Sequence, residues 1–394
     1  MLTRLVTMKG MLALLGALTA VGPLSLDMYL PALPSLGHDL RAGESQVQLT
    51  ITACLIGLAA GQLFAGPLSD GWGRRRPVIA GAIAYSLATL LCALAPSVEL
   101  LVTARFLQGL AGGVGVVIAR AIVRDLYAGV AAAKYFSRLV LVFGVAPIVA
   151  PSVGSAVLRV ADWRGVFVVL AVVGALIALA VIRRLPETLP PERRNPGGLR
   201  RIAGNAKVLG QDRIFIGYAL AQGLAFAGMF SYIGGSSFVL QEAYGASSTV
   251  YGVIFGVNAL GLVATGQLNA RLLDTFAPRR ILVATLFVGL AAGLALIAAG
   301  TGGSLLLFTI ALWGYVASIG LVLPNCTALA LDRHPTMAGA ASALIGAAQS
   351  FIGALAAPVD GLVGGHRAVP MATVIAVCAA LALSTALFLA RPVA

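Results

Sequence analysis

Two charged residues lie inside apolar stretches, and their types suggest proton chemistry. Asp27 falls within the apolar segment 10–33 and Arg105 within the segment 99–121. Each lies about six residues from the same side of its segment, so two antiparallel helices would place both charges at one depth. A carboxylate among apolar groups can bind and release a proton near neutral pH, whereas arginine keeps its charge. We expect Asp27 to carry a proton and Arg105 to act as a fixed charge.

The two charges either form an ion pair or face one water-filled cavity. A static ion pair that only joins two helices is the structural alternative, but an apolar pair would join them without the cost of desolvation. Gln108 lies one turn from Arg105 on the same helix face. We expect Asp27, Arg105, Gln108 and the neighbours Met28 and Tyr29 to contact a bound substrate.

Long apolar segments must position these residues. Hydrophobic residues make up 59% of the 394 residues and charged residues 10%, against about 25% charged in a soluble domain. A helix needs about 20 apolar residues to cross a bilayer. Twelve such segments occur, so we expect an all-α integral membrane protein with helices at 10–33, 46–65, 77–95, 99–121, 135–158, 164–183, 213–240, 247–269, 280–300, 303–331, 337–359 and 369–390.

The positive charge indicates orientation. The net charge is +13, and most of the 27 Lys and Arg residues fall at the termini and in alternate loops. This is the bias that keeps basic loops in the cytoplasm, so both termini are expected there. The same distribution argues against nucleic-acid binding. The four cysteines lie in apolar spans without metal-ligand spacing, so neither a metal site nor a cofactor is expected.

The sequence divides into two similar halves. Proline and basic residues concentrate between Arg183 and Arg213, which predicts a six-helix bundle over 1–183, a cytoplasmic linker over 184–212 and a second bundle over 213–394. Gly66–Pro77 has a weaker copy at 270–280. Asp70 corresponds to Asp274 there, an offset of 204 residues (274 − 70). Two pseudo-symmetric bundles that meet at the membrane midplane are common in secondary transporters.

A conformational gate is predicted at the cytoplasmic ends. We expect Asp125 to pair with an arginine of the 66–77 hinge, and Asp70 to face a helix N-terminus, whose dipole favours anions. Helix capping and topology are the alternatives for these charges, and close packing alone is the alternative for the Gly/Pro run in 135–158. The candidate gate residues are Gly66, Asp70, Gly73, Arg74, Arg75, Arg124, Asp125, Gly144, Pro147, Pro151 and Gly154.

The second half offers polar and aromatic side chains in place of buried charges. Those that could line a cavity and bind substrate are Gln222, Phe226, Tyr232, Asn258, Trp313, Asn325 and Gln349. Packing and interfacial positions are the alternatives for the aromatic members, because aromatic residues in membrane helices also serve there.

With these motifs, the whole chain resembles the major facilitator superfamily. Its loop motif Gly-x-Leu-x-Asp-x-x-Gly-Arg-Arg is similar to the stretch that ends at Arg75, and Leu26–Pro34 resembles the first-helix signature of Bcr/CflA drug transporters. Arg105–Gly109 resembles a motif of drug–proton antiporters. The 144–154 run resembles the antiporter motif, although Ser152 and Ser155 replace usual members of it.

The resemblance implies a monomeric twelve-helix exporter in the bacterial inner membrane. It would drive amphipathic drugs, of the chloramphenicol or bicyclomycin type, outward against proton entry, with the proton motive force in place of a cofactor. Asp27 and Arg105 match the family's functional acid and arginine. Thr19 stands where some relatives have a second acid, which argues against multi-proton coupling or the export of dicationic drugs.

Two other transporter functions stay open. The chain could export one endogenous metabolite, because a fold does not fix its cargo, or import a nutrient with protons. A channel would need a continuous polar stripe, and a membrane enzyme would need His, Cys or paired acids at one depth. No Gly-x4-Gly-Lys-Ser/Thr motif supports an ATP-driven pump.

Overall fold

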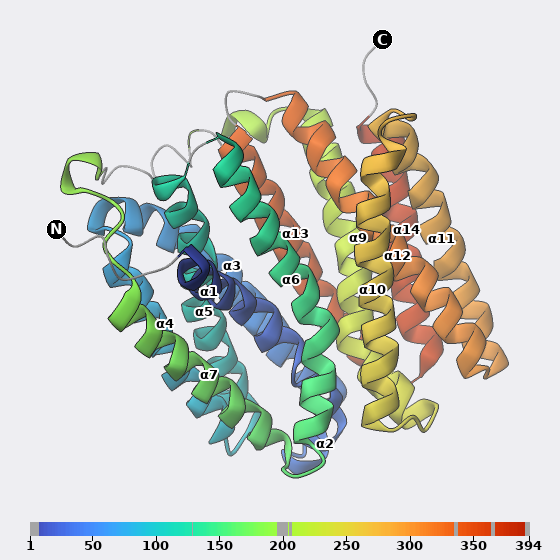
Figure 1. Ribbon diagram of the computed structural model, residues 1–394. Coiled ribbons are helices and arrows are strands. Elements are labelled where there is room, and N and C mark those ends of the chain that lie inside the picture. Colours follow the sequence, from blue (N-terminus) through green and yellow to red (C-terminus); the bar gives the residue numbers. More distant parts are fainter. Residues whose placement is uncertain are drawn as a thin grey trace. The chain divides into compact units, whose positions relative to one another are not determined.

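Every regular element that the computed structural model describes is a helix (Figure 1). The structure describes residues 8–127, 129–194, 204, 207–334, 338–363 and 367–390. Within these ranges the description omits the side chains of residues 8, 9, 124, 129–134, 136–138, 140, 141, 143, 144, 193, 338–340, 342, 343, 357, 358 and 360–363.

The helices follow the predicted apolar segments closely. In the first half they are α1 (Met8–Asp27), η1 (Leu30–Ala32), α2 (Leu33–Asp39), α3 (Glu44–Trp72), α4 (Arg75–Ala93), α5 (Val98–Leu126), α6 (Gly129–Val157), α7 (Trp163–Arg184) and η2 (Pro191–Arg193). In the second half they are α9 (Arg213–Phe238), η3 (Val239–Ala243), α10 (Ser248–Leu272), α11 (Pro278–Gly302), α12 (Leu305–Asp332), α13 (Ala338–Val363), α14 (Ala368–Ser384) and η5 (Thr385–Leu389).

The helices are long and apolar enough for a membrane protein. Ten segments of the described residues meet the length and hydropathy expected of a membrane-spanning helix. The other two long helices, α6 and α13, contain shorter described apolar stretches at Val145–Val157 and Leu344–Ala356. Together they account for the twelve expected segments, and the predicted all-α membrane architecture is confirmed.

Polar residues fix where several helices begin. The Asp162 carboxylate accepts hydrogen bonds from the N–H groups of Arg164 and Gly165 at the start of α7. The hydroxyls of Ser97, Ser247 and Ser304 cap α5, α10 and α12 in the same way. These caps satisfy N–H groups that have no partner within the helix.

The first predicted segment contains a break that the hydropathy pattern does not reveal. The α1 helix ends at Asp27, a short turn follows, and η1 and α2 continue to Asp39. Pro31 and Pro34 lack the N–H groups that a continuous helix would need, and proline disfavours the helical conformation in the residue before it. The break places Asp27 at a helix end.

The described helices form two compact units. The first contains α1, η1, α3 from Ala53 onward, and α4 to η2. Here α4 packs against α5 and α7, and α1 packs against α5 and α6. The second contains α2, α3 up to Thr52, and the elements from α9 to η5. In this unit α9 packs against α13 and α14, and α12 packs against α10 and α11.

A seam of four glycines joins α3 and α5 in the first unit. A Cβ atom on Gly57 would collide with the carbonyl oxygen of Phe106, and one on Gly109 would collide with that of Cys54. Gly61 and Gly113 are placed similarly one turn further along. Small residues let membrane helices approach until their backbones touch. The seam therefore fixes α5, which carries Arg105, against α3.

Part of this seam recurs in the second unit. A Cβ atom on Gly113 would meet the Leu58 oxygen and the Gln62 nitrogen of α3, and one on Gly320 of α12 would meet the Leu262 oxygen and the Gly266 nitrogen of α10. The matching offsets are 204 residues from α3 to α10 (262 − 58) and 207 from α5 to α12 (320 − 113). The packing within the two units thus follows the internal repeat of the sequence.

Candidate functional site

The end of α1 forms the centre of the first site. The Asp27 residue is buried, with 6% of its surface exposed, and Met28 and Tyr29 beside it are buried as well. The three residues predicted to act here therefore lie in the interior, at the break between α1 and η1.

Arg105 of α5 is fully buried, and several groups fix its position. Its Nη1 donates to the Ser25 carbonyl oxygen at 2.8 Å and to the Gln108 side-chain oxygen. Its guanidinium carbon lies 4.2 Å from the centroid of the Tyr29 ring, a cation–π distance. The predicted partners Gln108 and Tyr29 thus both contact Arg105.

A second layer of polar groups holds these partners, and the sequence did not indicate it. The Gln108 Nε2 donates to the Thr89 hydroxyl at 2.9 Å, and the hydroxyls of Ser25 and Tyr85 are hydrogen-bonded at 2.8 Å. Both Tyr85 and Thr89 belong to α4. Serine, threonine and tyrosine occur widely in membrane helices, so their types alone gave no signal.

Asp27 and Arg105 are neighbours without being an ion pair. Within the part of the chain that the structure describes, no ion pair joins the Asp27 carboxylate to the guanidinium. The Arg105 side chain instead binds the carbonyl oxygen of Ser25, two residues before Asp27. The static ion pair considered above is therefore not the arrangement observed. A carboxylate outside a salt bridge can change its protonation state without first breaking one.

The glycine and proline run of α6 lies against the same break. Gly154 touches the backbone of Met28 so closely that a Cβ atom would collide with the Met28 carbonyl oxygen. Pro147 and Pro151 both lie inside α6, and Pro151 is buried. The predicted gate residue Gly154 thus contacts the residue after Asp27. Two other predicted gate positions, the side chains of Arg124 and Gly144, lie outside the described residues.

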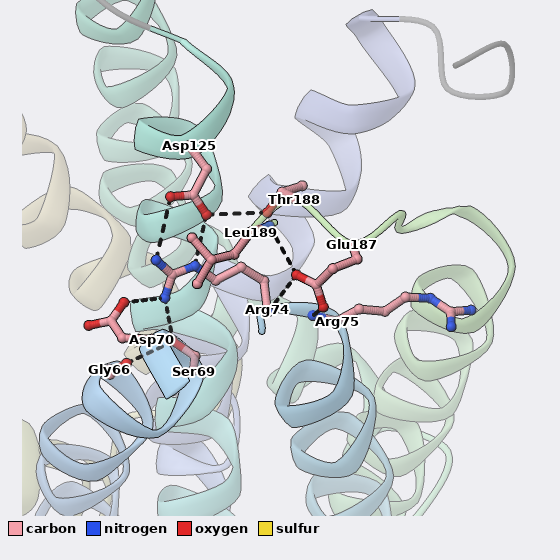
Figure 2. A network of polar contacts seen from close by, with 9 residues as sticks. All are labelled: Gly66, Ser69, Asp70, Arg74, Arg75, Asp125, Glu187, Thr188 and Leu189. Atoms are coloured by element: carbon pink, nitrogen blue, oxygen red, sulfur yellow. Dashed lines mark hydrogen bonds and ion pairs between the residues drawn. The ribbon is translucent and has the colours of Figure 1, made fainter. Parts of the chain in front are cut away.

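The predicted gate centres on Arg74 (Figure 2). Its Nε donates to Asp125 at 2.8 Å, and its Nη1 donates to Asp70 at 2.6 Å and to the Ser69 hydroxyl at 2.7 Å. The Ser69 hydroxyl donates in turn to the Gly66 carbonyl oxygen. One buried guanidinium therefore ties the end of α3 to the end of α5, and the contact between Asp125 and an arginine of the hinge is present.

Glu187 completes this cluster, and sequence analysis missed it. Its carboxylate accepts hydrogen bonds from the backbone N–H groups of Arg74 at 2.8 Å and Arg75 at 3.3 Å, where α4 begins (Figure 2). Gly73 has a φ of +89°, and a Cβ atom there would also strike the Glu187 carboxylate. A carboxylate at a helix N-terminus was expected from Asp70, but this position belongs to Glu187.

Arg75 and Thr188 tie the cluster to the end of α7. The Arg75 guanidinium donates to the carbonyl oxygens of Leu185 and Ile182. The Thr188 hydroxyl donates to Asp125 at 3.3 Å. The predicted linker therefore begins with residues that bind α4 and α5, whereas its positions 195–203, 205 and 206 lie outside the described residues.

The electrostatics of the cluster favour its charged forms. Burial tends to lower the pKa of the Arg74 guanidinium, but hydrogen bonds to Asp125 and Asp70 outweigh burial and raise that pKa. Burial tends to raise the pKa of the Glu187 carboxyl, but the N–H groups of Arg74, Leu189 and Arg75 outweigh it and hold the pKa below 4.5. Both groups remain charged at cellular pH.

A second charged cluster occurs at the start of α9, and it too was missed. The Asp212 carboxylate caps α9, accepts a hydrogen bond from Arg333 at 2.8 Å and is hydrogen-bonded to His334 at 3.0 Å. Burial tends to raise the pKa of Asp212, but these contacts and the N–H groups of Ile214 and Phe215 lower it to about 2. The cluster fixes the end of α12 to α9.

The polar residues predicted in the second half form hydrogen bonds between helices. Gln222 donates to Gln349 at 2.6 Å and accepts from Thr327 at 2.9 Å, which joins α9, α13 and α12. Two further pairs join α10 to its neighbours: Asn258 with Tyr232 at 3.1 Å, and Asn325 with Asn269 at 2.7 Å.

The remaining predicted residues of this half, Phe226 and Trp313, lie apart from these networks. Phe226 packs against Phe230, with ring centroids 5.0 Å apart. Trp313 is 43% exposed and borders a hollow of about 310 Å³ between α10 and α12, together with Asn258. Trp313 and Asn258 are thus the predicted binding residues that line this hollow.

Comparison with known proteins identifies the fold and the family. The profile of the Major Facilitator Superfamily matches residues 15–358. The chain belongs to the major facilitator superfamily. It is therefore a multi-pass membrane transporter and not an enzyme, as the sequence predicted.

Relatives at higher identity add the expected drug-transporter resemblance. The chain is 39% identical to an uncharacterized MFS-type transporter, YdgK, of Bacillus subtilis, over 93% of this chain and 92% of the relative. It is 31% identical to a bicyclomycin resistance protein homolog of Haemophilus influenzae, over 95% and 94%. The predicted similarity to Bcr/CflA-type transporters is confirmed.

Solved structures share the same fold at low identity. A mutant of the nucleoside transporter NupG has a TM-score of 0.77, with 97% of this chain and 98% of that chain covered at 12% identity. This likeness concerns the fold alone.

Proposed function

We propose that the chain is a proton-coupled exporter of amphipathic drugs that works by alternating access in the bacterial inner membrane. The observation that supports this most is Asp27, a buried acid at the break after α1, near a buried arginine that binds the Ser25 carbonyl oxygen. The name of the bicyclomycin resistance relative supports a drug as cargo.

Asp27 carries the proton in this proposal. A buried carboxylate is costly when charged and inexpensive when protonated, so its protonation changes what the surrounding cavity can accept. Arg105 cannot serve as the carrier, because its guanidinium does not deprotonate. Held by the Ser25 carbonyl and Gln108, Arg105 supplies a fixed positive charge that favours the deprotonated Asp27 when cargo arrives.

The Arg74 cluster acts as the cytoplasmic gate. It joins the ends of α3 and α5 through one guanidinium and two carboxylates. Opening toward the cytoplasm requires these contacts to break, and closing restores them. Gly154 couples the proton site to the helices that move, because α6 packs directly on Met28, the residue after Asp27. Both termini are cytoplasmic and the transporter is a monomer in this proposal.

The test measures proton movement driven by cargo. Inside-out membrane vesicles are acidified, and a panel of compounds that includes chloramphenicol is added while a pH-sensitive dye reports the lumen. We expect cargo-dependent alkalinisation with the wild type and its loss with Asp27→Asn. Glu99→Gln, at an exposed acid of α5, is the matched control and should behave as the wild type.

The outcomes separate the proposal from its alternatives. If Asp27→Asn still moves protons with cargo, the assignment of Asp27 is wrong. If no drug alkalinises the lumen, export of an endogenous metabolite becomes the better hypothesis. Proton entry that accompanies cargo in the same direction indicates a nutrient symporter.

A further inference from the structure

A hollow of about 310 Å³ lies between α10 and α12 in the second unit. Val253, Ile254, Val257 and Asn258 of α10 line one side, and Thr309, Ile310 and Trp313 of α12 line the other. Its volume lies at the lower end of the range for small-molecule pockets, about 300–1,000 Å³.

The internal repeat explains why the two helices stay apart here. With the offsets of 204 and 207 found above, Gly57 and Phe106 correspond to Gly261 and Trp313, and the Cys54–Gly109 contact corresponds to Asn258–Val316. A Cβ atom on Gly109 would strike the Cys54 backbone, so the bulkier Val316 cannot allow the same approach. The close backbone contact that the glycine seam makes between α3 and α5 is therefore missing on this side of the α10–α12 pair.

Trp313 lies directly on Gly261. A Cβ atom on Gly261 would be 2.5 Å from the Trp313 Nε1 and 2.9 Å from its Cε2, so the glycine provides the space that the indole ring occupies. The ring is held on one side by α10, and 43% of the residue remains exposed. It forms a flat apolar wall for the hollow.

The polar groups of the hollow are neutral. None of its seven lining residues is ionisable. Asn258 is 2% exposed, and its Nδ2 donates to the Tyr232 hydroxyl at 3.1 Å, so the amide oxygen is the atom left to accept a hydrogen bond from an occupant. The Thr309 hydroxyl donates to the carbonyl oxygens of Leu305 and Leu306. A cation would find no counter-charge among these residues, which favours an uncharged molecule.

We propose that this hollow binds the uncharged, ring-containing part of the cargo, with Trp313 as the stacking surface and Asn258 as the hydrogen-bond acceptor. This inference rests on the proposed function, because it assigns a position and a chemical class to the cargo of that transporter. An apolar ring gains from the aliphatic lining and the indole face, and a hydroxyl or amide N–H on it pairs with the buried amide. A lipid acyl chain would use the apolar walls but leave the Asn258 oxygen unpaired.

Intrinsic fluorescence tests the site directly in the full-length protein in lipid nanodiscs. The chain has three tryptophans, and chloramphenicol, a neutral nitroaromatic with hydroxyl and amide donors, quenches indole fluorescence on contact. We expect saturable quenching in the wild type, and Trp313→Phe should remove the saturable part. Asn258→Leu should weaken binding about tenfold, as for the loss of one buried hydrogen bond.

Filling the hollow provides the matched comparison. Val257 of α10 lines it and is 49% exposed, whereas Val288 of α11 is 56% exposed and does not line it. Val257→Phe should weaken chloramphenicol binding at least tenfold, and Val288→Phe should leave it unchanged. Equal effects of the two substitutions, or saturable quenching that survives Trp313→Phe, would overturn the proposal. Lipids with brominated acyl chains test the lipid alternative. If they quench Trp313 and added chloramphenicol does not reduce that quenching, the hollow is a lipid site.

The same variants separate this site from the transport mechanism. If chloramphenicol binds at Trp313 but neither it nor any other compound of the panel drives proton movement in vesicles, the site stands and the proposed function fails. The opposite result is that chloramphenicol drives proton movement, but Val257→Phe and Asn258→Leu leave both its binding and its transport unchanged. In that case the proposed function stands and the proposed binding site is wrong.

Discussion

At the scale of single residues, Arg74 and Arg105 are both buried but have different partners. Arg74 binds the carboxylates of Asp70 and Asp125, whereas Arg105 binds a backbone carbonyl and an amide oxygen. The first arrangement fixes two helix ends while it lasts. The second arrangement keeps the positive charge of Arg105 near Asp27 without an ion pair between the two side chains. The same residue type therefore suits both the proposed gate and the proposed proton site, and the hydrogen-bond acceptors differ between the two.

Glu187 gives a prediction at this scale that depends on pH. Its pKa is held below the ordinary 4.5, so its charge stabilises the folded state above pH 4.5, and this contribution is lost as the pH falls through the lower pKa of the folded protein. We expect Glu187→Gln to lower the apparent melting temperature in detergent at pH 7. The difference from the wild type should shrink below pH 4.5, as measured by circular dichroism.

Glu192→Gln is the control for this prediction. Glu192 lies in η2 of the same segment and is exposed. Its substitution should change the melting temperature little at any pH, because exposed charges contribute little. If Glu187→Gln and the wild type have the same melting temperature at pH 7, the hydrogen bonds from the N–H groups of Arg74 and Arg75 to Glu187 do not stabilise the fold.

The residue types predicted the charged pair and the hinge, but not the residues that orient them. Asp27, Arg105 and Asp125 are conspicuous because charge is rare in apolar segments. Thr89 and Tyr85 are common residues in such segments, and only the packing of α4 on α5 shows their role. Glu187 lies in the predicted basic linker, where its negative charge suggested no partner.

At the scale of helices, the glycine seam between α3 and α5 determines the position of Arg105. Gly57→Ala would place a Cβ atom against the Phe106 carbonyl, and the two backbones would have to separate. Overpacking of this kind costs about 1–3 kcal/mol or more. We expect Gly57→Ala to reduce the yield of folded protein and its survival on heating, measured by size-exclusion chromatography after a temperature series.

Gly346 of α13 is a suitable comparison, because a Cβ atom there meets no other described atom within 4 Å. Gly346→Ala should be neutral or slightly stabilising, since alanine favours a helix by about 1 kcal/mol over glycine. Equal thermal survival of the two variants would mean that the α3–α5 contact can relax without loss.

Hydropathy predicted the helices well but not their internal geometry. The segment 10–33 suggested one continuous helix, whereas the chain breaks after Asp27 and continues helically to Asp39. The prolines at 31 and 34 gave a signal for this break, but a sliding apolar window averages over it. The close α3–α5 approach depends on which faces meet, and the spacing of glycines in one helix does not determine its partner.

At the scale of the whole chain, the two units differ in chemistry. The first contains the buried acid and arginine, and the second joins its helices with neutral amides such as Gln222 and Gln349. The sequence indicated this asymmetry, because the second half offers polar and aromatic side chains in place of buried charges. The offset of 204 residues places Ser231 at the position of Asp27 (231 − 27). The sequence did not predict that most of the second-half polar residues bond to one another, since each partner comes from a different helix.

This division predicts separate effects on cargo and on protons. Gln222→Leu removes the bonds to Gln349 and Thr327 but leaves Asp27 and Arg105 unaltered. We expect the KM for cargo to rise, because Gln349 and Thr327 lose the side chain that holds them, with the number of protons per cargo molecule unchanged. Parallel measurement of cargo uptake and lumen pH in vesicles gives both quantities.

Gln241→Leu is the control, since Gln241 lies in η3 and donates to Ser237 of α9, which belongs to neither of the bonds that Gln222→Leu removes. It should leave KM and the proton ratio near wild-type values. A change in proton ratio with Gln222→Leu would mean that coupling is shared by both units.

The two seams also set where the transporter can change in evolution. At Gly57 and Gly109 a Cβ atom would collide with the facing backbone, so we expect few substitutions to be tolerated there. The α10–α12 boundary has open space beside Val257 and Ile310, and side chains of several sizes fit there. Under selection with a new antibiotic, we expect variants that broaden resistance to accumulate on this side of the repeat.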